Sequence, residues 1–453
     1  MSRVRLLFRA ASAASPRVAS LATVALTAIL LAGASGAAHA ESLALTGGTV
    51  HTVSGATLEN ATVVIRDGKI IAVGADATVP AGATVVPCAG KHVYPGMISA
   101  NTTLGLVEVG SVLGTNDSQE AGSINPNVRA EIEVNPESDR LPVTRINGIT
   151  SALVVPRGGT LNGTSALMHL DGWTEEDMTV LAPVGLHIQW PNMTITRAWY
   201  ITQTDDEQKK QRDQAIQRLK DAFDDARSYM KAHAAEGQSG IPRHDGDVRW
   251  DAMIKALKGD IPVFITASSL NQIRAALKFC DEQGLKRIVL VDGNDADLIV
   301  DELRARHIAV IADATLQLPR RGYESYDAEM GAPARLYRAG VTFCISDGGG
   351  DGANARNLPY HAAMAAAFGL PKDEALKAVT LYPAQILGVG DRLGSIEPGK
   401  IADLIVTDGD PLEIGTTVEQ VYINGHASSM ETRQTRLFKK YDARPRGPKA
   451  RSH

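Results

Sequence analysis

The sequence predicts a protein of the α/β class, with a (β/α)8 TIM-type barrel and a small β-sandwich domain formed from both termini. Three observations support this prediction. Short strand patterns with tight turns occupy both ends of the chain, and strand and helix patterns alternate through residues 263–369. The region between the two ends has about 300 residues, which suits a barrel with insertions better than an open sheet.

Composition and charge narrow the class of partner. The chain has 453 residues, of which 44% are hydrophobic and 21% are charged, and its formal net charge is -5. This composition is that of an ordinary globular protein. A weakly negative chain is attracted neither to nucleic acid nor to anionic membrane surfaces, so a small molecule is the expected substrate or ligand.

The three cysteines do not suggest a disulfide framework. Cys88, Cys280 and Cys344 are odd in number and far apart in the sequence. We expect them to be small buried hydrophobic residues, although a single bridged pair stays open.

The N-terminal residues have the pattern of a secretory signal peptide. A basic start with Arg3 and Arg5 precedes an apolar run at 21–31, and Ala-His-Ala at 38–40 matches a cleavage site. A retained membrane anchor is the less favoured alternative, because a spanning helix needs about 20 apolar residues. We therefore expect residues 1–40 to be removed and the mature chain to reside in the periplasm without an integral membrane span.

Two turn motifs mark the β-rich ends. Asp67-Gly68 lies between two apolar runs, and Asn424-Gly425 follows another. These dipeptides favour two-residue hairpins, because such turns need positive φ. The predicted domains are a composite β domain (41–91 and 391–430), a barrel (92–390) and a C-terminal tail (431–453).

The middle of the chain alternates between strand and helix patterns. Residues 263–266 and 287–291 are predicted strands, and the helix between them places the apolar side chains of 273–280 on one face. Repeated βα units imply a parallel sheet.

Residues 116–143, rich in Asn, Glu, Pro and Ser, are predicted to cross the barrel mouth. Thr204-Asp205-Asp206-Glu207 predicts the capped start of a long helix.

Four motifs carry a family resemblance. They are Asp-Gly-Lys-Ile at 67–70, Tyr-Pro-Gly-Met-Ile at 94–98, Ser-Asp at 346–347, and Gly-Ser-Ile-Glu-Pro-Gly-Lys-Ile-Ala-Asp-Leu at 394–404. On these motifs the sequence resembles the amidohydrolase superfamily, in particular the branch around imidazolonepropionase, over nearly the whole mature chain. The resemblance implies the barrel fold and hydrolysis of non-peptide C–N bonds in cyclic or linear amides.

The same resemblance implies a metal site, and the sequence departs from it. In the superfamily, divalent ions lower the pKa of a bound water from 15.7 to about 7. Their ligands are an H-x-H pair, often a modified lysine, two single histidines and a late aspartate. Here Asn101 and Thr103 stand at the H-x-H positions, and Thr266 and Asp292 stand at the single-histidine positions. Only Asp347, the late aspartate, is retained, and it is the predicted catalytic residue that handles the proton.

The remaining histidines do not replace these ligands. None are spaced as i, i+2 or i, i+4, and His187, on a predicted barrel strand, is either a candidate ligand or a hydrogen-bonded core histidine. We expect no binuclear zinc. The oxygen donors of Asn101, Thr103, Asp292 and Asp347 leave open a single hard cation such as calcium or magnesium. Two carboxylates that share a proton are a further alternative.

Two functions remain open from the sequence. The first is a hydrolase with a degenerate metal site. The second is a pseudoenzyme that binds a small molecule, or a structural subunit beside an active paralogue. The expected protein partners are a paralogue or further copies of the chain in a homo-oligomer. The glycine-rich stretch 346–352 is interpreted either as a mobile loop over the mouth or as a turn required by close packing.

Overall fold

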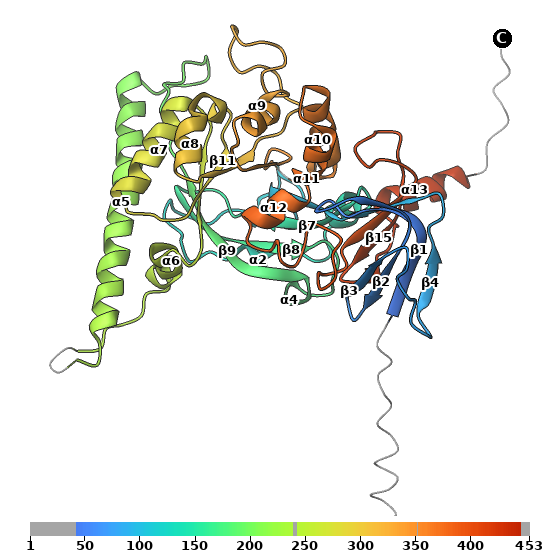
Figure 1. The fold of residues 1–453 in the computed structure, drawn as a ribbon. Helices are drawn as coiled ribbons and strands as arrows, with labels where there is room; N and C mark the ends of the chain where they lie inside the picture. Colours follow the sequence, from blue (N-terminus) through green and yellow to red (C-terminus); the bar gives the residue numbers. More distant parts are fainter. Residues whose placement is uncertain (1–41, 239–241, 351, 445–453) are drawn as a thin grey trace, which may run out of the picture. The chain divides into compact units, whose positions relative to one another are not determined.

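The computed structural model describes residues 42–238, 242–350 and 352–444. The predicted signal peptide lies outside these described residues, as does the end of the predicted tail, 445–453. From Ser42 the chain forms one compact unit, which contains two eight-stranded sheets (Figure 1). None of its described helices combines the length and the apolar character that crossing a membrane requires.

The first sheet joins strands from the two ends of the chain. Its strands are β1 (Ser42–His51), β2 (Thr57–Arg66), β3 (Lys69–Gly74), β4 (Thr84–Pro87), β5 (His92–Pro95), β14 (Leu404–Thr407), β15 (Val418–Ile423) and β16 (His426–Ala427). Their order is β16-β15-β14-β5-β1-β2-β3, with β4 also paired to β1. Because β14 pairs antiparallel with β5, the C-terminal strands extend the N-terminal sheet. The predicted β domain built from both termini is confirmed.

Both predicted hairpin turns are present, and they pack against each other. Asp67 and Gly68 have φ of +50° and +76°, and Asn424 and Gly425 have φ of +51° and +78°. All four values lie in the left-handed region that two-residue turns require. A Cβ atom on Gly68 would lie 2.6 Å from the Oδ1 of Asn424. The two turns therefore fit together only because Gly68 has no side chain.

The second sheet is the barrel. Its strands are β6 (Met97–Thr102), β7 (Ile149–Val154), β8 (Leu161–His169), β9 (Thr179–Gln189), β10 (Val263–Ala267), β11 (Ile288–Asp292), β12 (Ala309–Ala312) and β13 (Phe343–Ile345). They follow one another in sequence order around the sheet. All pairs are parallel except those of β8, which runs antiparallel to β7 and β9. The connections on either side of β8 are too short for the helical crossover that a parallel strand needs.

The barrel closes between β13 and β6 through the backbone of Ala378 and Val379. The Ile98 N–H donates to the Val379 carbonyl at 2.8 Å, and the Ile345 N–H donates to the Ala378 carbonyl at 3.0 Å. Inside, one apolar cluster takes a side chain from each strand, which only a closed sheet allows. Those side chains include Ile98, Leu153, Leu167, Val184, Phe264, Val289, Ile311 and Cys344. The structure confirms a TIM-type barrel, with one strand reversed.

Helices cover the outer face of the barrel strands (Figure 1). The longest, α5, begins at the predicted capping box, in which Thr204 and Glu207 bond reciprocally. In α7 the predicted apolar face, from Ile273 to Cys280, is buried. The helices are α2 (Ala130–Glu133), α3 (Arg140–Arg145), α4 (Glu175–Met178), α5 (Asp205–Ala235), α6 (Val248–Lys258), α7 (Leu270–Glu282), α8 (Val300–Ala305), α9 (Ala332–Arg338), α10 (Leu358–Ala367), α11 (Lys372–Lys377), α12 (Leu381–Ile386) and α13 (Arg433–Asp442), with 3-10 turns at Leu113–Thr115, Ala296–Ile299 and Ala355–Asn357.

All three cysteines are buried and unbridged. Burial raises the pKa of the Cys280 thiol to about 12. They therefore serve as small apolar residues, as the sequence predicts.

A buried carboxylate, Asp403, connects the barrel to the first sheet. Its side chain accepts hydrogen bonds from the Ser151 hydroxyl at 3.2 Å and from the Asn424 N–H at 2.8 Å. The His169 Nε2 lies 3.1 Å from the same carboxylate. Burial alone would lower the pKa of His169, but the charge and hydrogen bond of Asp403, together with the charge of Asp171, outweigh burial and raise it.

Replacing His169 with Gln should destabilise the protein most at acidic pH. Because the pKa of His169 is raised in the fold, the ion pair stabilises fully below about pH 6.5, and its contribution is lost as the pH rises through the folded value. Losing one member of a buried ion pair costs about 3 kcal/mol. We expect the difference in free energy of unfolding between wild type and variant to shrink as the pH rises above the ordinary histidine value of about 6.5. Urea unfolding of wild type and His169→Gln at each pH measures this difference. The control is His307→Asn, which replaces an exposed histidine. A difference that is constant with pH would contradict this assignment.

Candidate functional site

The residues at the predicted ligand positions come together at one end of the barrel. Asn101 and Thr103 lie at the end of β6, Thr266 near the end of β10, Asp292 at the end of β11, and Asp347 just after β13. The carboxyl ends of parallel barrel strands share one mouth, which is where sites form on this fold. Asn101, Thr103, Thr266 and Asp347 are buried there.

The centre of this mouth holds a residue that sequence reasoning missed, Arg157. It lies in the short connection between β7 and β8, at the end of the barrel where β7 finishes. Its Nη2 donates to the Oδ1 of Asn101 at 2.7 Å and to the Gly349 carbonyl at 2.9 Å. A guanidinium is therefore bonded to the first residue that occupies an H-x-H position.

Arg157 is held among carboxylates. Burial lowers the pKa of its guanidinium, while the charges of Asp292, Asp347 and Asp313 act to raise it. An arginine keeps its proton in proteins, because its ordinary pKa exceeds 12. The mouth thus contains a fixed positive charge that faces three acidic side chains.

Two of these acids titrate near neutral pH. Burial raises the pKa of Asp347 to about 6, although the hydrogen bond from Ser99 and the charge of Arg157 oppose the shift. The Ser99 hydroxyl donates to Oδ1 of Asp347 at 2.8 Å. Burial and the charge of Asp313 raise the pKa of Asp292 to about 6, again against Arg157. Both carboxyls can therefore bind or release a proton at physiological pH.

The glycine-rich stretch packs onto the same cluster. The Thr103 hydroxyl donates to the Gly350 carbonyl at 2.7 Å. A Cβ atom on Gly349, whose φ is +60°, would lie 2.5 Å from Nη2 of Arg157 and 2.6 Å from Nδ2 of Asn101. Only glycine lets the backbone approach this closely. The packing of Gly349 supports the second interpretation of the stretch 346–352, a turn required by close packing. Residue 351 of this stretch lies outside the described residues.

A second polar group, also missed from the sequence, borders the mouth at the end of β12. Asp313 accepts from the Ala314 N–H at 2.8 Å and pairs with Arg320 at 3.2 Å. The Asn294 amide bridges Asp313 and Glu329 at 3.3 Å and 3.1 Å. These contacts fix the carboxylate that raises the pKa of Asp292.

Thr266 and His187 lie on adjacent strands, β10 and β9. His187 pairs in register with Phe264, and their rings stack with centroids 4.7 Å apart. Burial, helped by the charge of Arg157, lowers the pKa of His187 to about 3, so the ring is neutral. Within the described part of the chain its Nε2 has no hydrogen-bond partner. His187 is thus a core histidine, but without the expected bond at that nitrogen.

These residues do not fit a divalent metal ion. Within residues 42–444, leaving out the undescribed gaps, no three His, Cys, Asp or Glu side chains are grouped to hold one. The Asn101 carbonyl already accepts from Arg157, and the Thr103 hydroxyl already donates to Gly350. The guanidinium would also repel a second cation at short range.

Several polar atoms in the mouth remain unsatisfied. Asn101 Nδ2, Arg157 Nε and His187 Nε2 are buried and lack partners among the described residues. An unsatisfied buried polar atom is costly unless a ligand or water meets it. These three atoms therefore mark the positions at which a bound water or a small polar group would be hydrogen-bonded.

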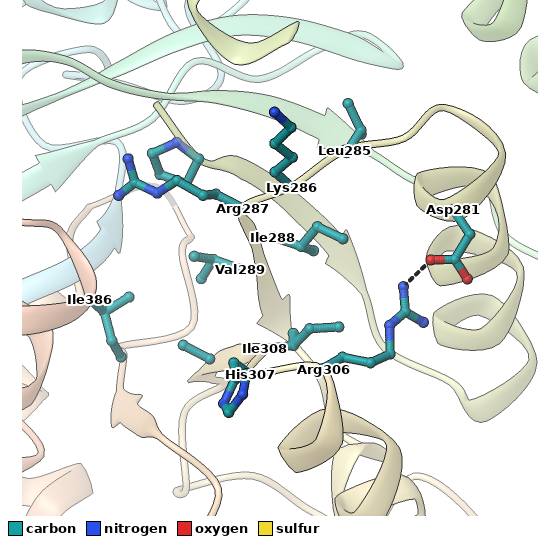
Figure 2. Close-up of a pocket in the computed structure, with 12 residues that line it drawn as sticks. Asp281, Leu285, Lys286, Arg287, Ile288, Val289, Arg306, His307, Ile308 and Ile386 are labelled. Carbon is teal, nitrogen blue, oxygen red and sulfur yellow. Dashed lines mark hydrogen bonds and ion pairs between the residues drawn. The ribbon is translucent and has the colours of Figure 1, made fainter. Parts of the chain in front are cut away.

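A separate cavity opens at the opposite end of the barrel. Figure 2 shows it at the starts of β11 and β12, with Arg287, Ile288 and Ile308 in its lining and Arg306 paired to Asp281. Its volume is about 470 Å³. Because catalytic groups of this fold lie at the carboxyl ends of the strands, this cavity is not the counterpart of the family's metal site.

Comparison with known proteins gives the family. The amidohydrolase family model matches residues 148–434. The chain belongs to the amidohydrolase family. Amidohydrolase tasK of Hapsidospora irregularis is 26% identical over 77% of this chain, but the match spans only 37% of that longer protein. Imidazolonepropionase of Brucella anthropi is 26% identical over 78% of this chain and 87% of its own length.

A solved structure supports the same placement. The amidohydrolase of Thermotoga maritima superimposes with a TM-score of 0.76 at 26% identity, covering 85% of this chain and 99% of that one. The molinate hydrolase structure, at 17% identity and a TM-score of 0.53, shares the fold. The chain is therefore an amidohydrolase-family member whose relatives include hydrolases of C–N bonds.

A signal for Arg157 was present in the sequence. A charged residue flanked by Pro156 and Gly158 follows directly on an apolar strand. In an amidohydrolase barrel such a position is at the mouth. What the sequence did not show was that the side chain of Arg157 reaches Asn101 and the backbone of Gly349.

Replacing Asp347 with Asn should flatten the pH dependence of stability. A carboxyl whose pKa rises from 3.8 to about 6 on folding favours the fold below its unfolded pKa, and that contribution is lost as the pH rises through the folded value. Two units correspond to about 3 kcal/mol. We expect wild type to lose about this much relative to Asp347→Asn between about pH 4 and pH 7. Urea unfolding of wild type and Asp347→Asn across this pH range measures the loss. The control is Asp301→Asn, which replaces an exposed carboxylate. Parallel curves for wild type and Asp347→Asn would rule out the buried carboxyl as the cause.

Proposed function

We propose that this chain is a non-hydrolytic member of the amidohydrolase family, in which a guanidinium–carboxylate cluster takes the place of the metal centre. It acts as a small-molecule binding protein or as a structural subunit beside an active paralogue. The observation that carries the proposal is the bond from Arg157 to Asn101 at an H-x-H position.

Electrostatics support this proposal. Metal-assisted hydrolysis needs a cation that makes hydroxide available, and without it the pKa of water stays at 15.7 instead of about 7. A guanidinium supplies positive charge but has no empty coordination position for water. Its charge compensates the carboxylates of Asp292, which is partly buried, and of Asp347, which is buried and would otherwise be costly to bury.

The packing over the mouth supports the proposal further. The Gly349 carbonyl is tied to Arg157, and the Gly350 carbonyl is tied to Thr103. These bonds hold the turn after β13 against the residues at the H-x-H positions. A substrate amide would have to displace this turn to reach Asp347.

One observation favours a second candidate, metal-independent hydrolysis. The pKa of Asp347 is raised to about 6, which suits a general acid or base near neutral pH. In that case Asp347 would move the proton, and Arg157 would bind the carbonyl oxygen of a cyclic or linear amide. This remains the alternative because, among the described residues, the Ser99 hydroxyl bonded to Asp347 is fully buried and so is not placed to attack a substrate.

Metal analysis with an activity panel separates the candidates. We expect the purified chain to contain well below one equivalent of zinc, manganese or iron by inductively coupled plasma mass spectrometry. We also expect no turnover of amides, lactams or dipeptides. Turnover abolished by Asp347→Asn, with metal still absent, would establish the second candidate. Stoichiometric metal with turnover would refute the proposal.

A gain of metal binding tests the role of Arg157 directly. A variant with histidine at positions 101, 103, 266 and 292 (Asn101→His, Thr103→His, Thr266→His and Asp292→His) restores the family's ligand types beside Asp347. We expect it to bind zinc only when Arg157→Ala is added, because the guanidinium repels the ion. Isothermal titration with zinc gives the affinities, and the matched control is the four-histidine variant that keeps Arg157. Equal zinc affinity with and without Arg157 would show that the guanidinium does not exclude metal.

A further inference from the structure

Helix α13, near the end of the described chain, has an apolar face that is not buried. Thr432 caps it by accepting from the Thr435 N–H at 3.1 Å. None of its residues is buried. Leu437 is 38% exposed, Phe438 is 71% exposed, and Tyr441 is 59% exposed. Because Tyr441 follows these two residues by four and three positions, all three side chains lie on one face.

Basic residues flank this face. Arg433, Arg436, Lys439 and Lys440 lie on the same helix, and all four are exposed. Arg433 and Arg436 lie 3.4 Å and 3.9 Å from Asp139. No carboxylate in the described part of the chain forms an ion pair with Lys439 or Lys440.

The charge of this segment is opposite to that of the rest of the protein. Residues 433–453 contain eight Lys or Arg and one Asp, a side-chain charge of +7, while the whole chain has -5. The average over the chain therefore conceals a strongly basic end. Two copies of this segment would repel each other, so a second copy is a poor cover for the apolar face.

We propose that α13 binds the surface of anionic phospholipid membranes. A short helix with an exposed apolar face, aromatic residues and flanking Lys and Arg has the composition of interfacial membrane-binding helices. Leu437, Phe438 and Tyr441 enter the interface, and the basic side chains meet the headgroup phosphates. The contact would hold the protein at a membrane surface without a spanning helix, and it is independent of the barrel mouth.

Vesicle co-sedimentation of the chain from Ser42 onward tests the proposal. We expect it to bind vesicles of equal parts phosphatidylcholine and phosphatidylglycerol, and to bind phosphatidylcholine alone weakly. Lys439→Glu with Lys440→Glu should reduce binding about thirtyfold or more, because each basic residue near an anionic surface contributes about fivefold. Leu437→Ser with Phe438→Ser should also abolish most binding.

The control is Lys209→Glu with Lys210→Glu on α5, which makes the same change in net charge at exposed positions. It should bind as wild type does. Loss of binding in this control equal to that in the α13 variant would overturn the proposal in favour of a general charge effect. Absence of vesicle binding, or binding of double-stranded DNA but not of vesicles, would also overturn it.

Discussion

The guanidinium of Arg157 is the interaction on which the barrel mouth depends. It bonds to Asn101 and to the backbone of Gly349, and it compensates the charges of Asp292 and Asp347. Without this charge, carboxyls buried so deeply would remain protonated to still higher pH. With it, their pKa values of about 6 leave both groups able to change charge near neutrality. In the proposed function, the same side chain that stabilises the mouth also disfavours a divalent ion there.

The topology of the barrel explains how Arg157 reaches this place. In an all-parallel barrel the chain leaves the mouth after each strand through a helix on the outer face. Here β8 runs back directly from the end of β7, so the short connection stays at the mouth. This connection brings a positive charge to Asn101, one of the positions where the family resemblance predicts a metal ligand.

The barrel mouth and the C-terminal segment have opposite electrostatic character. The mouth gathers acidic side chains around Arg157, and the C-terminal segment gathers basic residues beside an exposed apolar face. Net charge is an average that describes neither region, because charge acts over about a Debye length, some 8 Å at physiological ionic strength. For this reason the total of -5 did not indicate the membrane contact proposed for α13.

The sequence by itself determined the family, through motifs that resemble it. It also determined the barrel, the composite sheet and the turns at Asp67-Gly68 and Asn424-Gly425, because these depend on local periodicity and on backbone conformations that few residues adopt. The family resemblance also singled out Asn101, Thr103, Thr266, Asp292 and Asp347, which the structure places at or near the carboxyl ends of barrel strands. Only the tertiary structure decided that β8 is reversed, that Arg157 contacts Asn101, and that Asp313 lies close enough to raise the pKa of Asp292. Those features depend on distances between residues far apart in the chain, and buried charge interactions are set by such distances and not by sequence spacing.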